Sequence, residues 1–261
     1  MNQQQRQRNQ FTALNHVKKM EELYSLQIAH SIQYSKVYTE SHQFNTELGK
    51  TKDQVETQHI LAKLDSVAAV KQFSGEGKVC VLNFASYKHP GGGYITGAVA
   101  QEECLCHEST LYNVISSNPF KPFYQYNNDH LNHGHYKNRA IYSPDIVFVD
   151  NDENAVCTAD VLTCAAPNYC YHIRQRVSLK SNLQALQSRI EYIKKILISN
   201  DINIAILGAY GCGVFGQDAC TVAKMFLDTF KADNGTIHKI IYAIPGGPNY
   251  AAFNNVFKYG R

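Results

Sequence analysis

The chain has 261 residues, 44% of them hydrophobic, which is enough for one large domain with a sizeable core. A formal net charge of +3 is too small to indicate a nucleic-acid or membrane surface, and no run approaches the roughly 18 apolar residues of a membrane span. The polar start resembles no signal peptide, and eight cysteines in so long a chain are best explained as free thiols in a reducing cytosol. These features predict a cytoplasmic protein with neither a nucleic-acid nor a membrane partner.

Helical and strand patterns begin after a polar start. The first ten or so residues are rich in Gln, Asn and Arg and are expected to be disordered, whereas residues 11–32 carry apolar side chains at helical spacing. Residues 36–60 are polar and ambiguous. Residues 59–73 could begin as a strand and continue as a helix. The short apolar run 79–84 predicts a strand that is covered on both faces.

Strands and helices then alternate to the end of the chain. The expected elements are helix 98–115, strands 141–149 and 155–166, helix 179–198, strand 202–207, helix 218–230 and strand 239–244. This alternation predicts an α/β fold with helices on both faces of the sheet.

Two glycine-rich loops each follow a predicted strand and precede a predicted helix. The first contains Gly91-Gly92-Gly93, and the second spans residues 208–216. Because ligands of open α/β sheets bind beyond the carboxyl ends of strands, both loops could line one cleft. Neither loop has the Walker or the Rossmann pattern, so a nucleotide or diphosphate site of another kind is one interpretation. A simple turn is the other for either loop taken alone.

Two adjacent carboxylates, Glu102 and Glu103, lie just beyond the triple glycine, near the predicted start of a helix. The helix dipole favours acids in a first turn, so the pair could be ordinary first-turn acids. In a closed cleft, one of them could instead transfer a proton during hydrolysis of a glycosidic bond. The residues alone leave both interpretations open.

The motif Gly91-Gly92-Gly93, seven residues and then Gln101-Glu102-Glu103 resembles the signature of poly(ADP-ribose) glycohydrolases, in particular the bacterial or microbial-type branch. Further agreement lies, in chain order, in segments 81–86, 89–90, 141–144, 165–168 and 208–215. The resemblance implies a three-layer α/β/α macrodomain-like fold with a mixed central sheet and an N-terminal helical extension. It places a partly helical extension at residues 1–57 and the catalytic domain at residues 58–261.

The resemblance also implies roles for individual residues. Glu103 corresponds to the catalytic acid and base, which protonates the departing ribose oxygen and then activates water. Glu102 would hold hydroxyls of the ribose beside the scissile bond, and Phe215 would pack on the terminal ribose. The expected substrate-binding residues are Asn83, Gly91, Gly92, Gly93, Gln101, Asn168, Gly211, Cys212, Gly213, Val214 and Phe215. Residues 211–214 would present amides to the diphosphate, whereas Asn83 and Asn168 receive no firm role.

The implied activity is hydrolysis of the ribose–ribose O-glycosidic bond of poly(ADP-ribose), which releases ADP-ribose and needs no cofactor or metal. The implied partner is ADP-ribose, its polymer or an ADP-ribosylated protein. The alternatives are a reader that binds ADP-ribose without cleaving it, a hydrolase of another ADP-ribosyl conjugate, and another nucleoside or nucleotide hydrolase on the same fold. A reader would not need two glutamates.

Other reactive side chains favour structural explanations. The run Cys104-Leu105-Cys106-His107 lacks a second pair at zinc-finger spacing, and no partner histidine makes Cys212 a nucleophile. Three histidines lie in the Tyr/Asn-rich stretch 123–136, which is expected to be a solvated loop: His130, His133 and His135.

Overall fold

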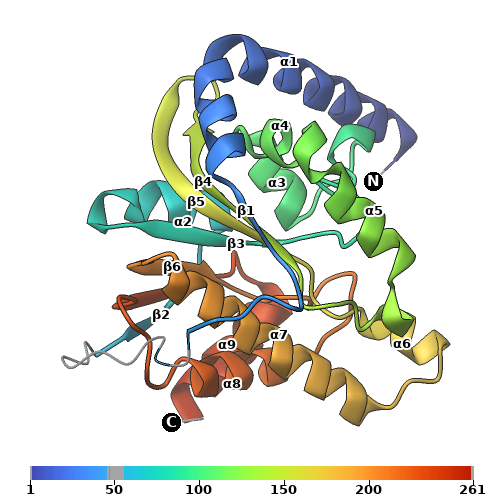
Figure 1. The fold of residues 1–261 in the computed structure, drawn as a ribbon, viewed down its shortest axis with the longest axis vertical. Helices are drawn as coiled ribbons and strands as arrows, with labels where there is room; N and C mark the ends of the chain where they lie inside the picture. Colours follow the sequence, from blue (N-terminus) through green and yellow to red (C-terminus); the bar gives the residue numbers. More distant parts are fainter. Residues whose placement is uncertain (1, 46, 48–55, 260–261) are drawn as a thin grey trace.

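The computed structural model describes residues 2–45, 47 and 56–259, which form a central sheet of seven strands between two layers of helices (Figure 1). The strand order is β1-β4-β5-β3-β6-β7-β2. The strands are β1 (Lys36–Tyr38), β2 (Gln58–Ala62), β3 (Val79–Phe84), β4 (Ala140–Val149), β5 (Ala155–Cys164), β6 (Ile204–Leu207) and β7 (Lys239–Ala243). The expected three-layer α/β/α architecture with a mixed sheet is confirmed.

The central strand β3 determines where the site lies. It pairs in parallel with β5 on one side and with β6 on the other, while β4 runs antiparallel to both β5 and β1. Helices cover both faces of β3, which explains why its sequence is apolar at every position but Asn83 rather than alternating. The carboxyl ends of β3 and β6 meet at one edge of the sheet, and the two glycine loops leave from there.

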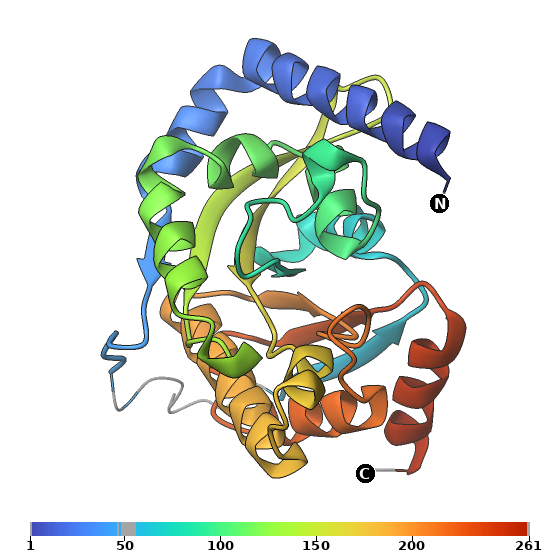
Figure 2. The same ribbon diagram turned by 90° about the vertical axis from the view of Figure 1, so that its right-hand side faces the viewer.

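One helical layer contains the N-terminal helix and the helices that follow β2 and β3. They are α1 (Gln3–Tyr34), α2 (Ser66–Phe73), α3 (Gln101–His107), α4 (Leu111–Ile115) and α5 (Lys121–Asp129). Their apolar faces share one core with the sheet, in which Val70, Leu105 and Val114 are fully buried. Figures 1 and 2 show α1 lying across α3 and α4 on the outside of this layer.

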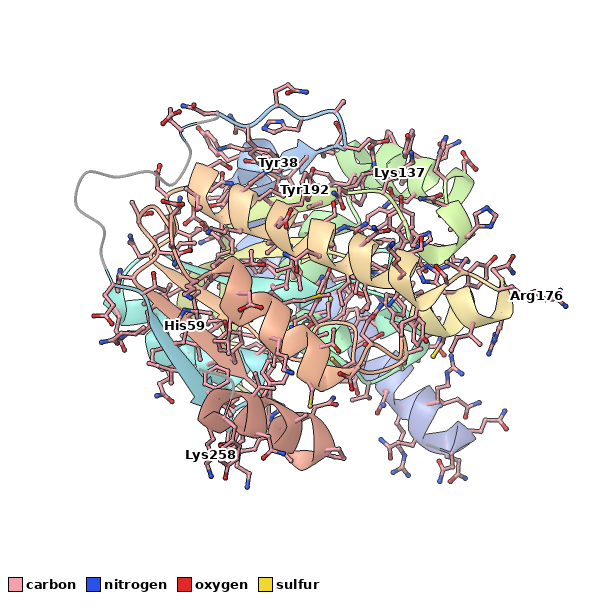
Figure 3. All side chains as sticks on the ribbon, turned by 90° about the horizontal axis from the view of Figure 1, so that it is seen from below. Tyr38, His59, Lys137, Arg176, Tyr192 and Lys258 are labelled. Atoms are coloured by element: carbon pink, nitrogen blue, oxygen red, sulfur yellow. The ribbon has the colours of Figure 1, made fainter. Side chains whose placement is uncertain are left out.

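The other face of the sheet is covered by α7 (Leu179–Ser199), α8 (Ala219–Thr229) and α9 (Gly247–Tyr259), seen in orange to red in Figure 3. The helix expected over residues 179–198 is confirmed as α7, and its apolar face packs on the sheet, since Leu186, Ile190 and Ile193 are fully buried. A short helix, α6 (Tyr169–Arg174), follows β5. Short 3-10 turns are η1 (Ser74–Glu76), η2 (Tyr94–Thr96), η3 (Asn118–Phe120) and η4 (Asn132–Gly134).

The prediction that the first ten residues are disordered was wrong, since α1 begins at Gln3. The Asn2 side chain accepts a hydrogen bond from the Gln5 amide and so caps the helix. Gln and Arg are good helix formers, and Arg6 also donates from Nε to the carbonyl of Thr96 at 2.9 Å. The polar composition concealed a helix that is held by contacts to a distant loop.

The helix expected over residues 98–115 is two helices, because residues 108–110 pair with β4. Thr110 donates its amide to the carbonyl of Val147, and Glu108 accepts from the amide of Val149. Both helices bury apolar residues against the same core, so their sequence shows one continuous periodicity.

The stretch 123–136 is also not a solvated loop. Helix α5 covers its first half, with Phe123, Tyr124 and Asn127 buried. Asn127 donates to the carbonyl of Tyr87 at 2.9 Å and accepts from Arg139 at 3.0 Å, so its polar groups are satisfied inside the protein. The elements β1, α6 and α9 were not predicted at all.

The expected boundary at residue 58 coincides with the start of β2. Strand β1, from the predicted extension, is nevertheless the edge strand on β4, and α1 packs on the same core as the sheet. Part of the ambiguous stretch 36–60 lies outside the described residues. None of the described helices combines the length and apolar character needed to cross a membrane.

Candidate active site

The two glycine loops line one cleft at the carboxyl edge of the sheet. A cavity of about 650 Å³ is lined by Gly92, Gly93, Glu102 and Glu103 from the first loop and from α3. A smaller apolar slot of about 150 Å³ is lined by the second loop and adjoins the larger cavity. The larger cavity and the slot share four lining residues, which are Phe84, Ala100, Val214 and Phe215. The expectation of a shared cleft is confirmed.

Glu102 lies in the first turn of α3 and is only 4% exposed. Its Oε2 accepts a hydrogen bond from the Ser86 amide at 2.7 Å, and its Oε1 accepts from Asn83 Nδ2 at 3.1 Å. Burial raises the pKa of Glu102 to about 8, and the neighbouring charge of Glu103 acts in the same direction, against the lowering effect of these hydrogen bonds. Glu102 therefore carries a proton at neutral pH.

Glu103 lies beside it with a different set of contacts. Its Oε1 accepts a hydrogen bond from the Gly93 amide at 2.8 Å, the one hydrogen bond that this carboxylate accepts from the part of the chain that the structure describes. Its second oxygen is thus left for a ligand. A carboxyl group that lines a cleft with an oxygen to spare can exchange a proton with a bound molecule.

Gly92 must be glycine because the loop passes directly against both carboxyl groups. Its φ is +59°, and a Cβ at this position would lie 2.7 Å from Glu103 Oε1 and 2.8 Å from Glu102 Oε2. Only a residue without a side chain allows this backbone to lie so close to the acids.

Gln101 anchors the start of α3 to the end of β3. Its Oε1 accepts from the Phe84 amide at 2.8 Å, while its Nε2 donates to the Leu82 carbonyl at 2.9 Å and to Ser66 Oγ at 3.0 Å. Strand β6 pairs with β3 only as far as Val81, so the Gln101 amide takes the place of the missing strand partner. Both of its N–H groups are used, which leaves none to donate to a ligand.

The second loop presents backbone rather than reactive side chains. The amides of Gly211, Gly213 and Val214 donate no backbone hydrogen bond within the described residues, whereas the Cys212 amide donates to the carbonyl of Ala209. Burial raises the pKa of the Cys212 thiol to about 12, so it is a neutral thiol at neutral pH. Nothing lies within 4 Å of a Cβ placed on Gly213.

Four of the expected site residues, one of them Cys212, lie apart from the cleft lining. Asn168 caps α6, accepting from the Tyr171 amide at 2.9 Å, and Asn83 is fully buried beside Glu102. Gly91 packs on Tyr112, whose Cδ2 would lie 2.7 Å from a Cβ at that position.

Sequence reasoning did not assign several residues that do line the cleft. His89 and Pro90 line the cleft and could have been assigned to it from their position just before the glycines. Ile95, Thr96 and Tyr112 also line it, but no feature of the sequence indicates this. No group of three or more His, Cys, Asp or Glu side chains suited to a metal ion occurs within the described ranges.

Comparisons with known proteins agree with this geometry. Residues 5–151 match the family model described as "Microbial-type PARG, catalytic domain", where PARG is poly(ADP-ribose) glycohydrolase. The structure is similar to that of PARG from Thermomonospora curvata, with a TM-score of 0.85 and 26% identity over 95% of this chain and 99% of that chain. No protein with a curated description matches the sequence.

Two similar structures contain ligands. PARG from T. curvata bound to the inhibitor ADP-HPD has a TM-score of 0.81 and 26% identity over 95% of this chain and 99% of that chain. PARG from Deinococcus radiodurans in complex with ADP-ribose has a TM-score of 0.77 and 26% identity over 89% of this chain and 98% of that chain. The family match includes α1 from residue 5 onward, the triple glycine and both glutamates.

The raised pKa of Glu102 predicts a pH-dependent stability difference for Glu102→Gln. The unfolded chain loses this proton near the ordinary pKa of 4.5 and the folded chain only near 8, so the parent loses stability as pH rises between these values. Relative to the parent, the Gln variant should gain on the order of 4 kcal/mol in free energy of unfolding between pH 4 and pH 8.5, at about 1.4 kcal/mol per pKa unit. Urea denaturation at both pH values measures this gain. Glu22→Gln, at an exposed position, is the control. If the difference in free energy of unfolding between Glu102→Gln and the parent does not change with pH, the raised pKa of Glu102 is wrong.

Gly92→Ala should destabilise the fold, because the methyl group meets two carboxyl groups and the residue must keep a positive φ. The left-handed backbone alone costs about 1–2 kcal/mol, and the contacts add to this value. Gly75→Ala is the matched control, since nothing lies within 4 Å of its Cβ position. Equal urea midpoints for the two variants would show that the loop does not lie against the acids.

Proposed function

The chain belongs to the family of microbial-type poly(ADP-ribose) glycohydrolase catalytic domains, and we propose that it hydrolyses poly(ADP-ribose) with Glu103 as the general acid and base. The bond cleaved joins the ribose of the terminal unit to a ribose of the next unit. Glu103 gives its proton to the departing ribose oxygen, and its carboxylate then takes a proton from the water that adds to the anomeric carbon. The products are ADP-ribose and a polymer one unit shorter.

The observation that carries this proposal is the difference between the two acids. Glu103 lines the cleft with one oxygen engaged by the Gly93 amide, whereas both oxygens of Glu102 accept hydrogen bonds from the protein. A proton-transfer group needs an oxygen that the protein leaves available, and Glu103 has one.

Glu102 holds the ribose beside the scissile bond. Because its pKa is about 8, it is a neutral acid at neutral pH and can both donate to and accept from a ribose hydroxyl. A neutral Glu102 also adds no negative charge beside Glu103 or beside the anionic diphosphate of the substrate.

The second glycine loop binds the diphosphate. The amides of Gly211, Gly213 and Val214, which donate to no backbone carbonyl within the described residues, are its donors. The Cys212 amide is already engaged, so this residue contributes shape rather than a hydrogen bond. Phe215 lines both spaces of the cleft and packs on the terminal ribose.

The partner that fits this cleft is free ADP-ribose, its polymer or an ADP-ribosylated protein. We place the protein in the cytoplasm, where the reducing milieu suits eight cysteines that are all free thiols.

Glu103→Gln should abolish turnover while it leaves ADP-ribose binding intact. Loss of the proton transfer should lower kcat by about 100- to 10,000-fold, and the isosteric side chain still accepts from Gly93. Release of ADP-ribose from labelled polymer measures kcat, and calorimetry measures the Kd of ADP-ribose. Glu22→Gln is the control. If the variant turns over polymer at the parental rate, the mechanism is wrong. If the parent binds ADP-ribose but releases none from the labelled polymer, the protein is a reader.

Gln101→Met should lower kcat more than it weakens ADP-ribose binding, because Gln101 orients the glutamates instead of donating to the substrate. We expect a decrease in kcat of about tenfold or more from a small misplacement of the acids, with the Kd of ADP-ribose within about threefold. Asn234→Leu is a matched control in the loop between α8 and β7, where Asn234 donates to Phe230 O and Thr57 Oγ1. A large rise in Kd with kcat preserved would show that Gln101 binds substrate.

A further inference from the structure

The part of the cleft wall next to Glu103 is covered on its outside by the N-terminal helix. This wall is Gly93–Gly97, called the rim segment below, and its Gly93, Ile95 and Thr96 line the cleft. Arg6 donates from Nε to the Thr96 carbonyl at 2.9 Å, and Asn9 donates from Nδ2 to the Gly97 carbonyl at 3.3 Å. Figures 1 and 2 show the N-terminal half of α1 running over this region.

The helix and the rim segment touch backbone to backbone at Gly97. This residue has a φ of +79°, and a Cβ there would lie 2.1 Å from the Arg6 carbonyl oxygen and 3.1 Å from the Gln10 amide nitrogen. No side chain fits between the two, so the position of α1 sets the position of Gly97.

Tyr94 provides the second attachment. Its ring is fully buried, its hydroxyl donates to the Ala13 carbonyl at 3.3 Å, and the same hydroxyl hydrogen-bonds His16 Nδ1 at 2.8 Å. The ring also packs edge-on against His107, with centroids 4.6 Å apart, and therefore links α1 to the C-terminal end of α3. Burial lowers the pKa of His16 to about 4, so this contact is between neutral groups at neutral pH.

The rim segment connects these contacts with α1 to the carboxylate of Glu103. The carbonyl of Gly93 accepts from the amides of Thr96 and Ala98, both at 3.0 Å, so the segment is one compact turn. The amide of the same Gly93 holds Glu103 Oε1 at 2.8 Å. A shift of the turn therefore moves the donor that orients Glu103.

We propose that the Gln3–His16 part of α1 is a positioning element for catalysis, which holds the rim segment and, through the Gly93 amide, the Glu103 carboxylate. This inference rests on the proposed function of Glu103. The later part of α1 has a different role, since Ser31 and Tyr24 bond the carbonyls of Asp145 and Glu153 around the β4–β5 hairpin. The two halves of one helix thus serve the site and the sheet separately.

A first pair of variants separates positioning from general stability. Tyr94→Phe removes the hydroxyl that bonds Ala13 and His16 and keeps the buried ring. Tyr192→Phe is its match on the other helical layer, where the hydroxyl donates to the Thr39 carbonyl at 2.9 Å (Figure 3). Both variants should have a lower Tm than the parent. Only Tyr94→Phe should lose kcat, by about tenfold, since small misplacements of a catalytic group are costly.

A second pair tests the backbone contact. Gly97→Ala forces α1 away from the rim segment, whereas Gly75→Ala meets nothing within 4 Å. Gly97→Ala should also lower kcat by about tenfold with the Kd of ADP-ribose within about threefold, because the second glycine loop is untouched. If Gly97→Ala does not fold, Tyr94→Phe decides the question.

The measurements are kcat from the release of ADP-ribose, the Kd of ADP-ribose from calorimetry, and Tm. A loss of kcat with Kd preserved supports the proposal. A kcat equal to that of the controls overturns it, and so does a parallel loss of kcat and affinity, which would mean that α1 supports the whole pocket. A parent that releases no ADP-ribose would refute the proposed function and this inference with it, whereas an active parent with unaffected variants refutes the inference alone.

Discussion

A buried carboxyl group beside a second one is the constraint on which the cleft depends. Glu102 is kept out of water at the end of the central strand, where the Ser86 amide and the Asn83 side chain hydrogen-bond its oxygens. Burial disfavours the charged form of Glu102, and the neighbouring charge of Glu103 adds to this effect, so Glu102 keeps its proton at neutral pH. That arrangement needs a loop without side chains against the acids, which Gly92 supplies. Gly92 and the Gln101 anchor at the start of α3 both contribute to this packing of the acids.

Much of the fold could be predicted because its strands and helices carry strong local patterns. The run over residues 79–84 is apolar except for Asn83 because helices cover both of its faces, and the strand has these bounds in the structure. The shared cleft also followed from topology, since parallel strands place their carboxyl ends together. Residue chemistry alone left Glu102 and Glu103 as either first-turn acids or a catalytic pair. In the structure both acids lie in the first turn of α3 and also line the cleft, which is the position that the proposed catalytic role requires.

What could not be predicted depends on partners that are distant in the sequence. The start of α1 looks disordered by composition, yet Arg6 bonds a carbonyl ninety positions later. The stretch that became α5 looks solvated, yet Asn127 and Arg139 satisfy each other inside the protein. Gln101 was expected to bind substrate because it belongs to a signature motif, and its three hydrogen bonds to Phe84, Leu82 and Ser66 are invisible in the motif itself. Periodicity reports on burial, and it carries no information about which polar groups meet.

The close contact between α1 and Gly97 has a consequence for how such a helix changes over evolutionary time. On the helix side the contact at Gly97 is made by the backbone, through the carbonyl of Arg6 and the amide of Gln10, and the Tyr94 hydroxyl likewise donates to the carbonyl of Ala13. Backbone groups are the same in every amino acid except for the missing N–H of proline, so most helix-compatible substitutions in this part of α1 preserve these contacts. Selection on this backbone contact therefore acts on the loop glycine, whereas on the helix it acts only on the side chains that make their own contacts, Arg6, Asn9 and His16.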